Sequence, residues 1–171
     1  LKPLLPPRER RGLILIDPAV TPYPDTVVGT LYKLPGVGEF LNLLPGDFLM
    51  KNNLKSIWFH NPNKVTDAYA EEVLRPLCIK GSHEGLMHVL RNVLREPFVE
   101  NEAKELARTD LPILLVHGRE DRAVPLNNSR LLNKMWKNSR LAVFERAGHS
   151  PHEEHPEKFN ALALSFLSER N

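Results

Sequence analysis

Three short runs of apolar residues stand out along this 171-residue chain. They cover residues 12–16, 112–117 and 141–144. Each run is continuous rather than alternating, which predicts strands covered on both faces, as in a parallel sheet. A polar or turn-forming segment follows each run directly. We therefore expect three short buried strands, one near the start of the chain and two in its last third.

Amphipathic helices are predicted after the second and third of these strands. Each contains apolar residues at helical spacing, which places them on one face. The two predicted faces consist of Leu131, Leu132, Met135 and Trp136, and of Phe159, Leu162, Ala163 and Phe166. The region 109–171 thus follows a strand–helix–strand–helix order, which predicts an α/β fold with a parallel sheet.

The intervening residues 20–108 show no convincing strand. Two amphipathic helices are predicted there instead, the first with Thr66 as its N-cap. Their apolar stripes are Tyr69, Ala70, Val73, Leu74 and Leu77, and Leu86, Val89, Leu90, Val93 and Leu94. A helical insertion of this length between sheet strands predicts a cap over a ligand site; an ordinary helical excursion is the alternative.

Two residues that can carry chemistry follow the last two strands. Asp121 lies in the turn after the second strand, and His149 lies in the turn after the third. Both turns emerge at the carboxyl edge of a parallel sheet, where neighbouring strands lie about 4.8 Å apart. A carboxylate bonded to a histidine fixes its tautomer and stabilises the imidazolium that forms when it takes a proton. The pair is typical of an acid and a general base.

These motifs resemble those of the α/β-hydrolase fold family. Residues Gly118–Pro125 match its G-x-x-D-x-x-x-P acid turn, and residues 148–152 match its histidine turn. Residues 13–19 are similar to its sixth strand. Residues 61–77 are similar to cap helices of its esterase, epoxide-hydrolase and carbon–carbon hydrolase branches. The resemblance covers nearly the whole chain.

This resemblance implies the C-terminal part of an α/β-hydrolase sheet with an inserted helical cap. The core would comprise residues 1–19 and 109–171, and the cap or lid residues 20–108. The family's nucleophile elbow, G-x-S-x-G, occurs nowhere in the sequence, and Lys80–Gly85 has the wrong spacing. Because the first residue is Leu1 rather than Met, we expect the N-terminal half and its nucleophile to lie upstream. The chain alone is then expected to be inactive.

The resemblance further implies a hydrolase that cleaves a small apolar ester-type substrate. An upstream nucleophile would attack, His149 would act as general base, and Asp121 would orient it. Two alternatives stay open. One is an epoxide or haloalkane hydrolase with an upstream Asp nucleophile, and the other is a non-catalytic receptor or pseudoenzyme that keeps only the pocket. No cofactor is implied.

Other side chains compete for the same roles. Glu120 and Asp17 are rival acids, since some branches of the family place the acid after the sixth strand. His149, His152 and His155 recur at every third residue, but the run His-Glu-Glu-His differs from H-E-x-x-H, so no metal site is predicted. His152 is expected at the pocket rim or beside the base. His117, at the end of an apolar strand, is expected to be a core histidine, and Tyr23, Tyr32 and Tyr69 to serve packing.

Composition and charge exclude only a few classes of protein. A formal charge of +2 gives no strong field for nucleic acid or an anionic membrane. No apolar run approaches the roughly 18 residues of a membrane span. The single cysteine, Cys78, excludes an internal disulfide framework. The compartment stays open, with a soluble, cytoplasmic protein as the default expectation.

Overall fold

The computed structural model describes the protein in several separate ranges. They are residues 12–20, 51–52, 54–82, 84–85, 88 and 100–168. Several predictions therefore concern residues outside this description. They are the second cap helix over 86–94 and the roles of Tyr23 and Tyr32.

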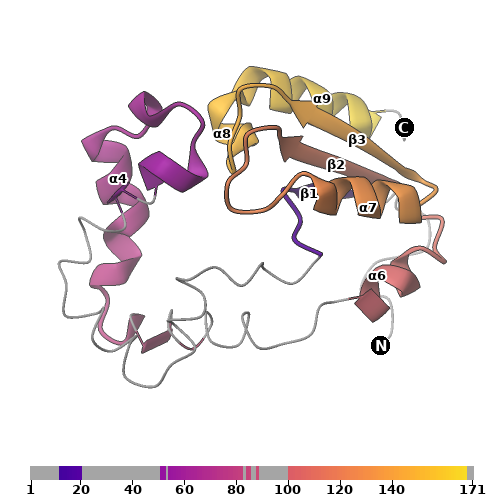
Figure 1. The fold of residues 1–171 in the computed structure, drawn as a ribbon, viewed down its shortest axis with the longest axis horizontal. Helices are drawn as coiled ribbons and strands as arrows, with labels where there is room; N and C mark the ends of the chain where they lie inside the picture. The colour runs from indigo at the N-terminus through magenta and orange to yellow at the C-terminus, as the bar shows by residue number, and fades with distance from the viewer. Residues whose placement is uncertain are drawn as a thin grey trace.

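A three-stranded parallel sheet forms the centre of the described structure (Figure 1). Its strands are β1 (Leu13–Ile16), β2 (Ile113–Gly118) and β3 (Ser139–Phe144), in the order β1-β2-β3. All three predicted strands are thus present. Only β2 is buried along its whole length, because it alone has a strand on either side among the described residues. The outer strands are mostly half-buried, so burial on both faces was predicted correctly for β2 only.

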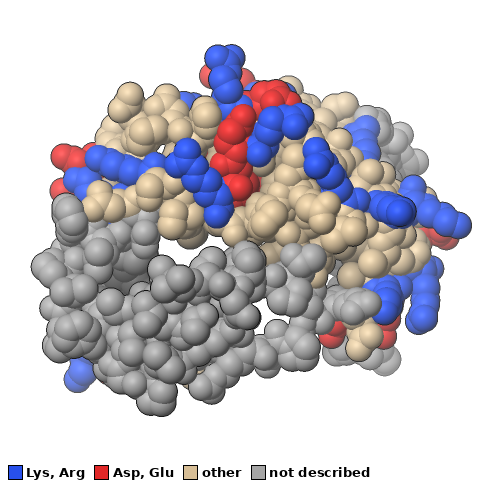
Figure 2. All heavy atoms as spheres, in the orientation of Figure 1, with Lys and Arg blue, Asp and Glu red and all other residues tan. Residues whose placement is uncertain are grey.

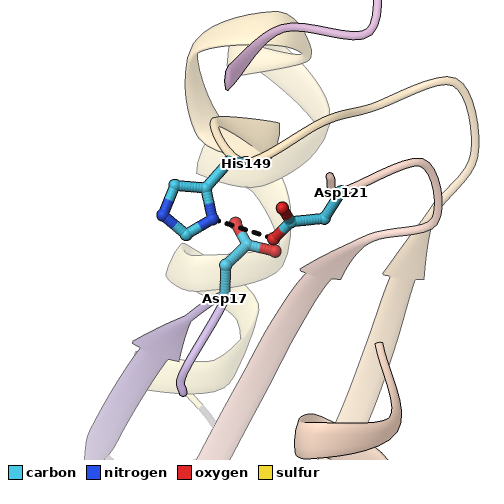
Figure 3. A group of neighbouring side chains, drawn as sticks. All are labelled: Asp17, Asp121 and His149. Carbon is cyan, nitrogen blue, oxygen red and sulfur yellow. Dashed lines mark hydrogen bonds and ion pairs between the residues drawn. The ribbon is translucent and has the colours of Figure 1, made fainter. Parts of the chain in front are cut away.

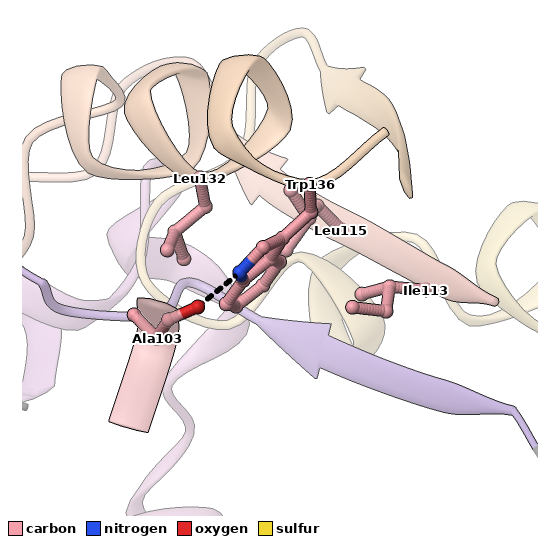
Figure 4. Packing of buried hydrophobic residues seen from close by; sticks show 5 residues of the cluster. All are labelled: Ala103, Ile113, Leu115, Leu132 and Trp136. Atoms are coloured by element: carbon pink, nitrogen blue, oxygen red, sulfur yellow. Dashed lines mark hydrogen bonds between the residues drawn. The ribbon is translucent and has the colours of Figure 1, made fainter. Parts of the chain in front are cut away.

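Helices cover both faces of the sheet. Helix α7 (Asn127–Met135) lies on one face, and helix α9 (Pro156–Ser168) lies on the other (Figure 1). Alternate residues of β2 point to opposite faces, as a pleated strand requires. Ile113 and Leu115 pack with Leu132 and Trp136, next to α7 (Figure 4), whereas Leu114 and Val116 pack with Phe144 and Phe166, next to α9.

The buried face of α7 differs from the prediction. Leu132 and Trp136 are buried as expected, but Leu131 and Met135 are 42% and 38% exposed. Two polar residues, Asn128 and Ser129, occupy the rest of the buried face. Their side chains bond to Val20 N–H and to the His117 ring, so polar contacts set the rotation of the helix. The predicted face of α9 agrees better, since Phe166 is buried and Phe159 and Leu162 pack beside it.

The segment predicted to form a cap contains several short helices. They are η1 (Leu54–Trp58), η2 (Pro62–Lys64), α4 (Asp67–Leu74), η3 (Arg75–Cys78) and α6 (Glu100–Leu106). The Thr66 hydroxyl caps α4 by accepting the Tyr69 N–H at 3.1 Å, as predicted. Residues 54–74 of this segment have a small core of their own, formed by Leu54, Phe59, Val65 and Ala70, with Tyr69 and Leu74 beside it. Val73, from the predicted stripe, is 39% exposed.

Helix α6 packs against the α/β part rather than against these short helices. Its residue Ala103 is buried beside Trp136, and the Trp136 Nε1–H donates to the Ala103 carbonyl at 2.8 Å (Figure 4). In Figure 1 the α4 region lies beside one end of the sheet, whereas α6 lies close to α7. The chain between β1 and β2 thus contacts the α/β part in two places, through His60 near η1 and through Ala103 in α6.

Charged side chains on the face shown in Figure 2 are dispersed, with acidic groups lying among basic ones. A single-sign patch is therefore not a feature of that face over the described residues. Among those residues, no helix combines the length and apolar character needed to cross a membrane.

Candidate active site

Three titratable side chains meet at the carboxyl edge of the sheet, each following a different strand (Figure 3). Asp17 follows β1, Asp121 follows β2, and His149 follows β3. One ligand-type atom from each lies within 4.8 Å of the others. The adjacency of the three strands brings together residues that are far apart in the sequence, at the edge where α/β sheets place ligands.

Asp121 and His149 form the expected pair. His149 Nδ1–H donates to Asp121 Oδ2 at 2.8 Å, and the other ring nitrogen points away from both carboxyl groups (Figure 3). The Asp121 side chain is fully buried, whereas that of His149 is 22% exposed. The carboxylate thus fixes the tautomer that leaves Nε2 free to accept a proton.

The turn after β2 holds Asp121 rigidly. Its Oδ1 accepts the N–H groups of Ala123 and Val124 at 2.7 and 2.9 Å, an Asx-type turn that leaves Oδ2 for His149. At the start of this turn, Gly118 lies against the chain before His149. A Cβ on Gly118 would sit 1.9 Å from the Gly148 carbonyl oxygen. The two turns are therefore in backbone contact, which places the acid and the histidine together.

Burial opposes the positive charge on His149, but the Asp121 hydrogen bond and the charges of Asp121 and Asp17 outweigh it, so the pKa of His149 is raised above its usual value. An imidazole with a raised pKa is a stronger proton acceptor, as a general base requires. Trp58 packs edge-on against the His149 ring, with centroids 5.4 Å apart. The indole is 44% exposed and belongs to the predicted cap.

Asp17 is close to the pair but is held differently. Its backbone has a φ of 46°, a region that non-glycine residues seldom adopt. Oδ1 accepts the Gly118 N–H at 2.8 Å, while Oδ2 is buried with no hydrogen-bond partner. Burial raises the pKa of Asp17 to about 7; the Gly118 hydrogen bond opposes this rise, and the nearby charge of Asp121 adds to it. As the rival acid, Asp17 is near His149, but the hydrogen bond to Nδ1 belongs to Asp121.

His117 is fully buried, and its Nε2 lies 3.6 Å from Asp17 Oδ1 and 3.5 Å from Asp121 Oδ2. Its Nε2–H donates to the Val124 carbonyl at 3.0 Å, so Nδ1 accepts from the Ser129 hydroxyl at 2.7 Å. Burial lowers the pKa of His117, which keeps the ring neutral between the carboxyl groups. It is the core histidine that the sequence predicts.

The remaining candidates lie elsewhere. Glu120, the second rival acid, accepts the Ala147 N–H at 3.1 Å and so braces the histidine turn instead of bonding to His149. The His152 ring packs near Phe159, while His155 Nε2 bonds to the Arg146 carbonyl. The three histidines thus face different surroundings. Tyr69 packs on Phe59, as expected, and its hydroxyl also donates to Glu153.

Within the described ranges, Asp17, Asp121 and His149 are the group that could hold a metal ion. Carboxylates and imidazole are suitable ligands for a divalent cation. However, an ion there would have to take the Nδ1 and Oδ2 atoms that already bond to each other at 2.8 Å. The arrangement fits an acid–base pair better than a metal centre.

Three features of the site were not found by sequence reasoning. Trp58 was not singled out, because a lone aromatic residue in a short helix has no distinctive pattern. Glu154, five residues after His149, is 2% exposed and bonds to the backbone on both sides of the site. In the sequence it belongs to a polar run at a helix start, where acids are common. The Asp17 backbone strain also has no sequence signal.

An acid–histidine pair at the carboxyl edge of a parallel sheet, beside a helical insertion, is the arrangement that the resemblance to the α/β-hydrolase fold predicts. The model of the alpha/beta hydrolase family matches residues 4–162, and the chain belongs to this family. The predicted family and fold class are thereby confirmed.

Similar proteins include esterases and carbon–carbon hydrolases. A 2-hydroxy-6-oxononadienedioate/2-hydroxy-6-oxononatrienedioate hydrolase from Pseudomonas sp. is 33% identical over 82% of this chain and 51% of its own length. A pimeloyl-[acyl-carrier protein] methyl ester esterase from Neisseria meningitidis is 29% identical over 78% and 50%. The chain thus spans about half the length of these curated relatives.

Solved structures show the same fold. A meta-cleavage product hydrolase from Pseudomonas fluorescens IP01 superposes with a TM-score of 0.68 at 24% identity, over 94% of this chain and 57% of that one. A thermophilic esterase superposes with a TM-score of 0.60 at 21% identity, over 94% and 57%.

Proposed function

We propose that this chain supplies the acid and the base of an α/β-hydrolase that cleaves a small apolar ester. The observation that carries the proposal is the bond from His149 Nδ1 to the buried Asp121 carboxylate, with Nε2 directed away from it (Figure 3). The nucleophile would lie upstream of Leu1, since the sequence contains no G-x-S-x-G elbow. Residues 1–19 and 109–171 would form the core and residues 20–108 the cap.

The Asp121–His149 pair would serve each proton transfer of ester hydrolysis. The nucleophile hydroxyl attacks the ester carbonyl carbon and gives its proton to His149 Nε2, while Nδ1–H stays bonded to Asp121. The imidazolium then protonates the leaving alkoxide, and a covalent acyl-enzyme remains. In the second half a water molecule attacks the acyl carbon and gives a proton to the same Nε2. The imidazolium then returns a proton to the nucleophile oxygen as the carboxylic acid leaves. Trp58 would cover one side of the base and keep bulk water from it.

Carbon–carbon bond hydrolysis is a second candidate, favoured by the 33% identity to the Pseudomonas 2-hydroxy-6-oxononadienedioate hydrolase. The same base could serve both reactions, so the difference would reside in the pocket and the upstream half. Epoxide or haloalkane opening would require an upstream Asp as nucleophile. A receptor without turnover would bind a small apolar ligand and leave the acid–base pair unused.

The test uses the protein expressed from its complete coding sequence. Purified protein is assayed with p-nitrophenyl esters of increasing acyl length and with a 2-hydroxy-6-oxo dienoate, and it is incubated with a fluorophosphonate that traps an active serine. Ester turnover that disappears in His149→Ala supports the proposal. Preferential turnover of the dienoate selects the carbon–carbon reaction. Tight ligand binding with no turnover of any of these substrates would refute an enzymatic role.

A further inference from the structure

Glu154 is a buried carboxylate that the proposed chemistry does not use. It ends the short helix α8 (Pro151–Glu154) and is 2% exposed. Its carboxylate oxygens accept three backbone N–H groups, those of His60, Asn61 and Gly148. A charged acceptor with three backbone donors is strongly held, so the carboxylate is a fixed point in the structure.

These three donors come from two separate parts of the chain. His60 and Asn61 belong to the predicted cap, between η1 and η2, and they lie 3.0–3.1 Å from the carboxylate oxygens. Gly148 directly precedes His149, and its nitrogen lies 2.5 Å from Glu154 Oε1. One side chain thus fastens the 54–64 segment, which comprises η1 and η2, to the turn that carries the base.

The 54–64 segment approaches this turn backbone to backbone. A Cβ on Gly148 would lie 2.6 Å from the Trp58 carbonyl oxygen and 2.8 Å from the His60 nitrogen. The Lys64 ammonium adds a further bond to the Glu154 carbonyl oxygen. No side chain at position 148 separates the two backbones, so a shift of the segment is transmitted directly to the turn.

The same segment carries the indole that packs on the base. The Trp58 and His149 rings meet edge to face, at 86°. His149 is therefore held on two sides, by Asp121 through its Nδ1–H and by Trp58 across its ring. Glu154 fixes the backbone of both ring-bearing segments.

We propose that Glu154 is a positioning residue that locks the 54–64 segment onto the histidine turn, so that the orientation of His149 depends on the docking of the cap. The measurement of kcat rests on the proposed function, but the link that Glu154 makes between the 54–64 segment and the histidine turn does not. Without the carboxylate, the turn and the segment lose their common acceptor, and the His149 ring becomes freer to rotate and better hydrated.

The chain offers a matched control on the same helix. Glu153 also bonds to the cap, by accepting the Tyr69 hydroxyl at 2.5 Å, but the Gly148 N–H donates to Glu154 and not to Glu153. Glu153→Gln removes a negative charge next to Glu154 and perturbs one contact between cap and core. A defect found in Glu154→Gln but not in Glu153→Gln is therefore due to the link with the histidine turn.

The experiment follows the titration of His149 and the turnover of an ester in the protein from its complete coding sequence. The ring is observed by NMR with histidine labelled at Cε1, and its signal is assigned with His149→Gln. The titratable groups whose charges act on His149 are Asp121, Asp17 and His117, and none of the three is replaced in the variants.

In Glu154→Gln we expect the titration midpoint of His149 to shift and kcat to fall about 10- to 100-fold, the effect of a small misplacement of a catalytic group. KM should change less. In Glu153→Gln kcat should stay within about twofold of wild type, and the titration midpoint of His149 should not move. Equal behaviour of the two variants in both readouts would overturn the proposal.

Gly148→Ala provides a second route if Glu154→Gln does not fold. The added methyl group pushes the 54–64 segment away without changing any charge, and the same shift in midpoint and loss of kcat are expected. A normal midpoint and kcat in folded Gly148→Ala would refute the lock. If wild type hydrolyses nothing but Glu154→Gln still shifts the His149 midpoint, the lock stands and the proposed function fails.

Discussion

Replacing Asp121 by Asn isolates the chemical role of the carboxylate from its structural one. The Asn side chain keeps an oxygen for the Ala123 and Val124 N–H groups, so the turn after β2 is preserved. Its NH₂ group then faces His149 Nδ1, where the carboxylate accepted an N–H at 2.8 Å. Two donors cannot share this contact, so Nδ1 must become an acceptor and the ring proton moves to Nε2.

This change of tautomer removes the base. With Nε2 protonated, His149 cannot take the proton of the nucleophile, and the loss for such a tautomer switch is on the order of 10⁴-fold in kcat. That corresponds to about 5.5 kcal/mol of transition-state stabilisation at 1.36 kcal/mol per tenfold. The stability cost should be small by comparison, on the order of 1–2 kcal/mol, because each hydrogen bond keeps a partner.

The assay compares kcat for a p-nitrophenyl ester in wild type, Asp121→Asn and Asp17→Asn, with urea unfolding as the control for stability. We expect the Asp121 variant to lose nearly all turnover and the Asp17 variant to lose less than about tenfold, because Asp17 makes no hydrogen bond to His149. If Asp121→Asn kept more than a tenth of wild-type kcat, the assignment of the acid would be wrong. A much larger loss in Asp17→Asn would transfer the role to Asp17.

Three further predictions concern stability. Burial raises the pKa of Asp17 from 3.8 to about 7, so the folded state keeps a proton that the unfolded chain releases. The stability of wild type should therefore fall as the pH rises through this window, whereas that of Asp17→Asn should not. Urea titrations at pH 4 and 8 should show a gain of the variant relative to wild type of up to roughly 4 kcal/mol. Leu132→Ala should cost about 2–5 kcal/mol, whereas the exposed Leu131→Ala should stay within about 0.5 kcal/mol; equal costs would mean that α7 is rotated differently. Gly118→Ala should prevent folding, as judged by circular dichroism, since its Cβ meets backbone at 1.9 Å; a stable variant would contradict the contact between the turns.

The elements of the α/β part were predictable because their signals are local. A continuous apolar run of four to six residues defines each strand, and the Asp121 and His149 turns follow strands β2 and β3 directly. The β2–β3 pairing follows from a short connection through one helix. The position of β1 beside β2 is different, because a long insertion separates the two strands and no local signal predicts their pairing.

Helix rotation was harder to predict. Apolar spacing on α7 fits two overlapping stripes, one with Leu132 and Trp136 and one with Leu131 and Met135. The choice between them depends on Asn128 and Ser129, whose hydrogen bonds reach Val20 and His117 in other elements. Such bonds are invisible to a pattern based on hydrophobicity, since both residues count as solvent-facing there.

Sequence reasoning offered Asp17 only as a rival acid and did not single out Glu154, and it predicted the backbone contacts of neither. Each binds the backbone N–H of a glycine next to the site, Asp17 that of Gly118 and Glu154 that of Gly148. Every residue except proline offers such an N–H, so these partners leave no mark in the sequence. At both glycines an added Cβ would clash with a facing backbone. The acid turn and the histidine turn are therefore held in the same way, by close backbone contact and one buried carboxyl group each, which explains how two short turns can hold a 2.8 Å pair in register.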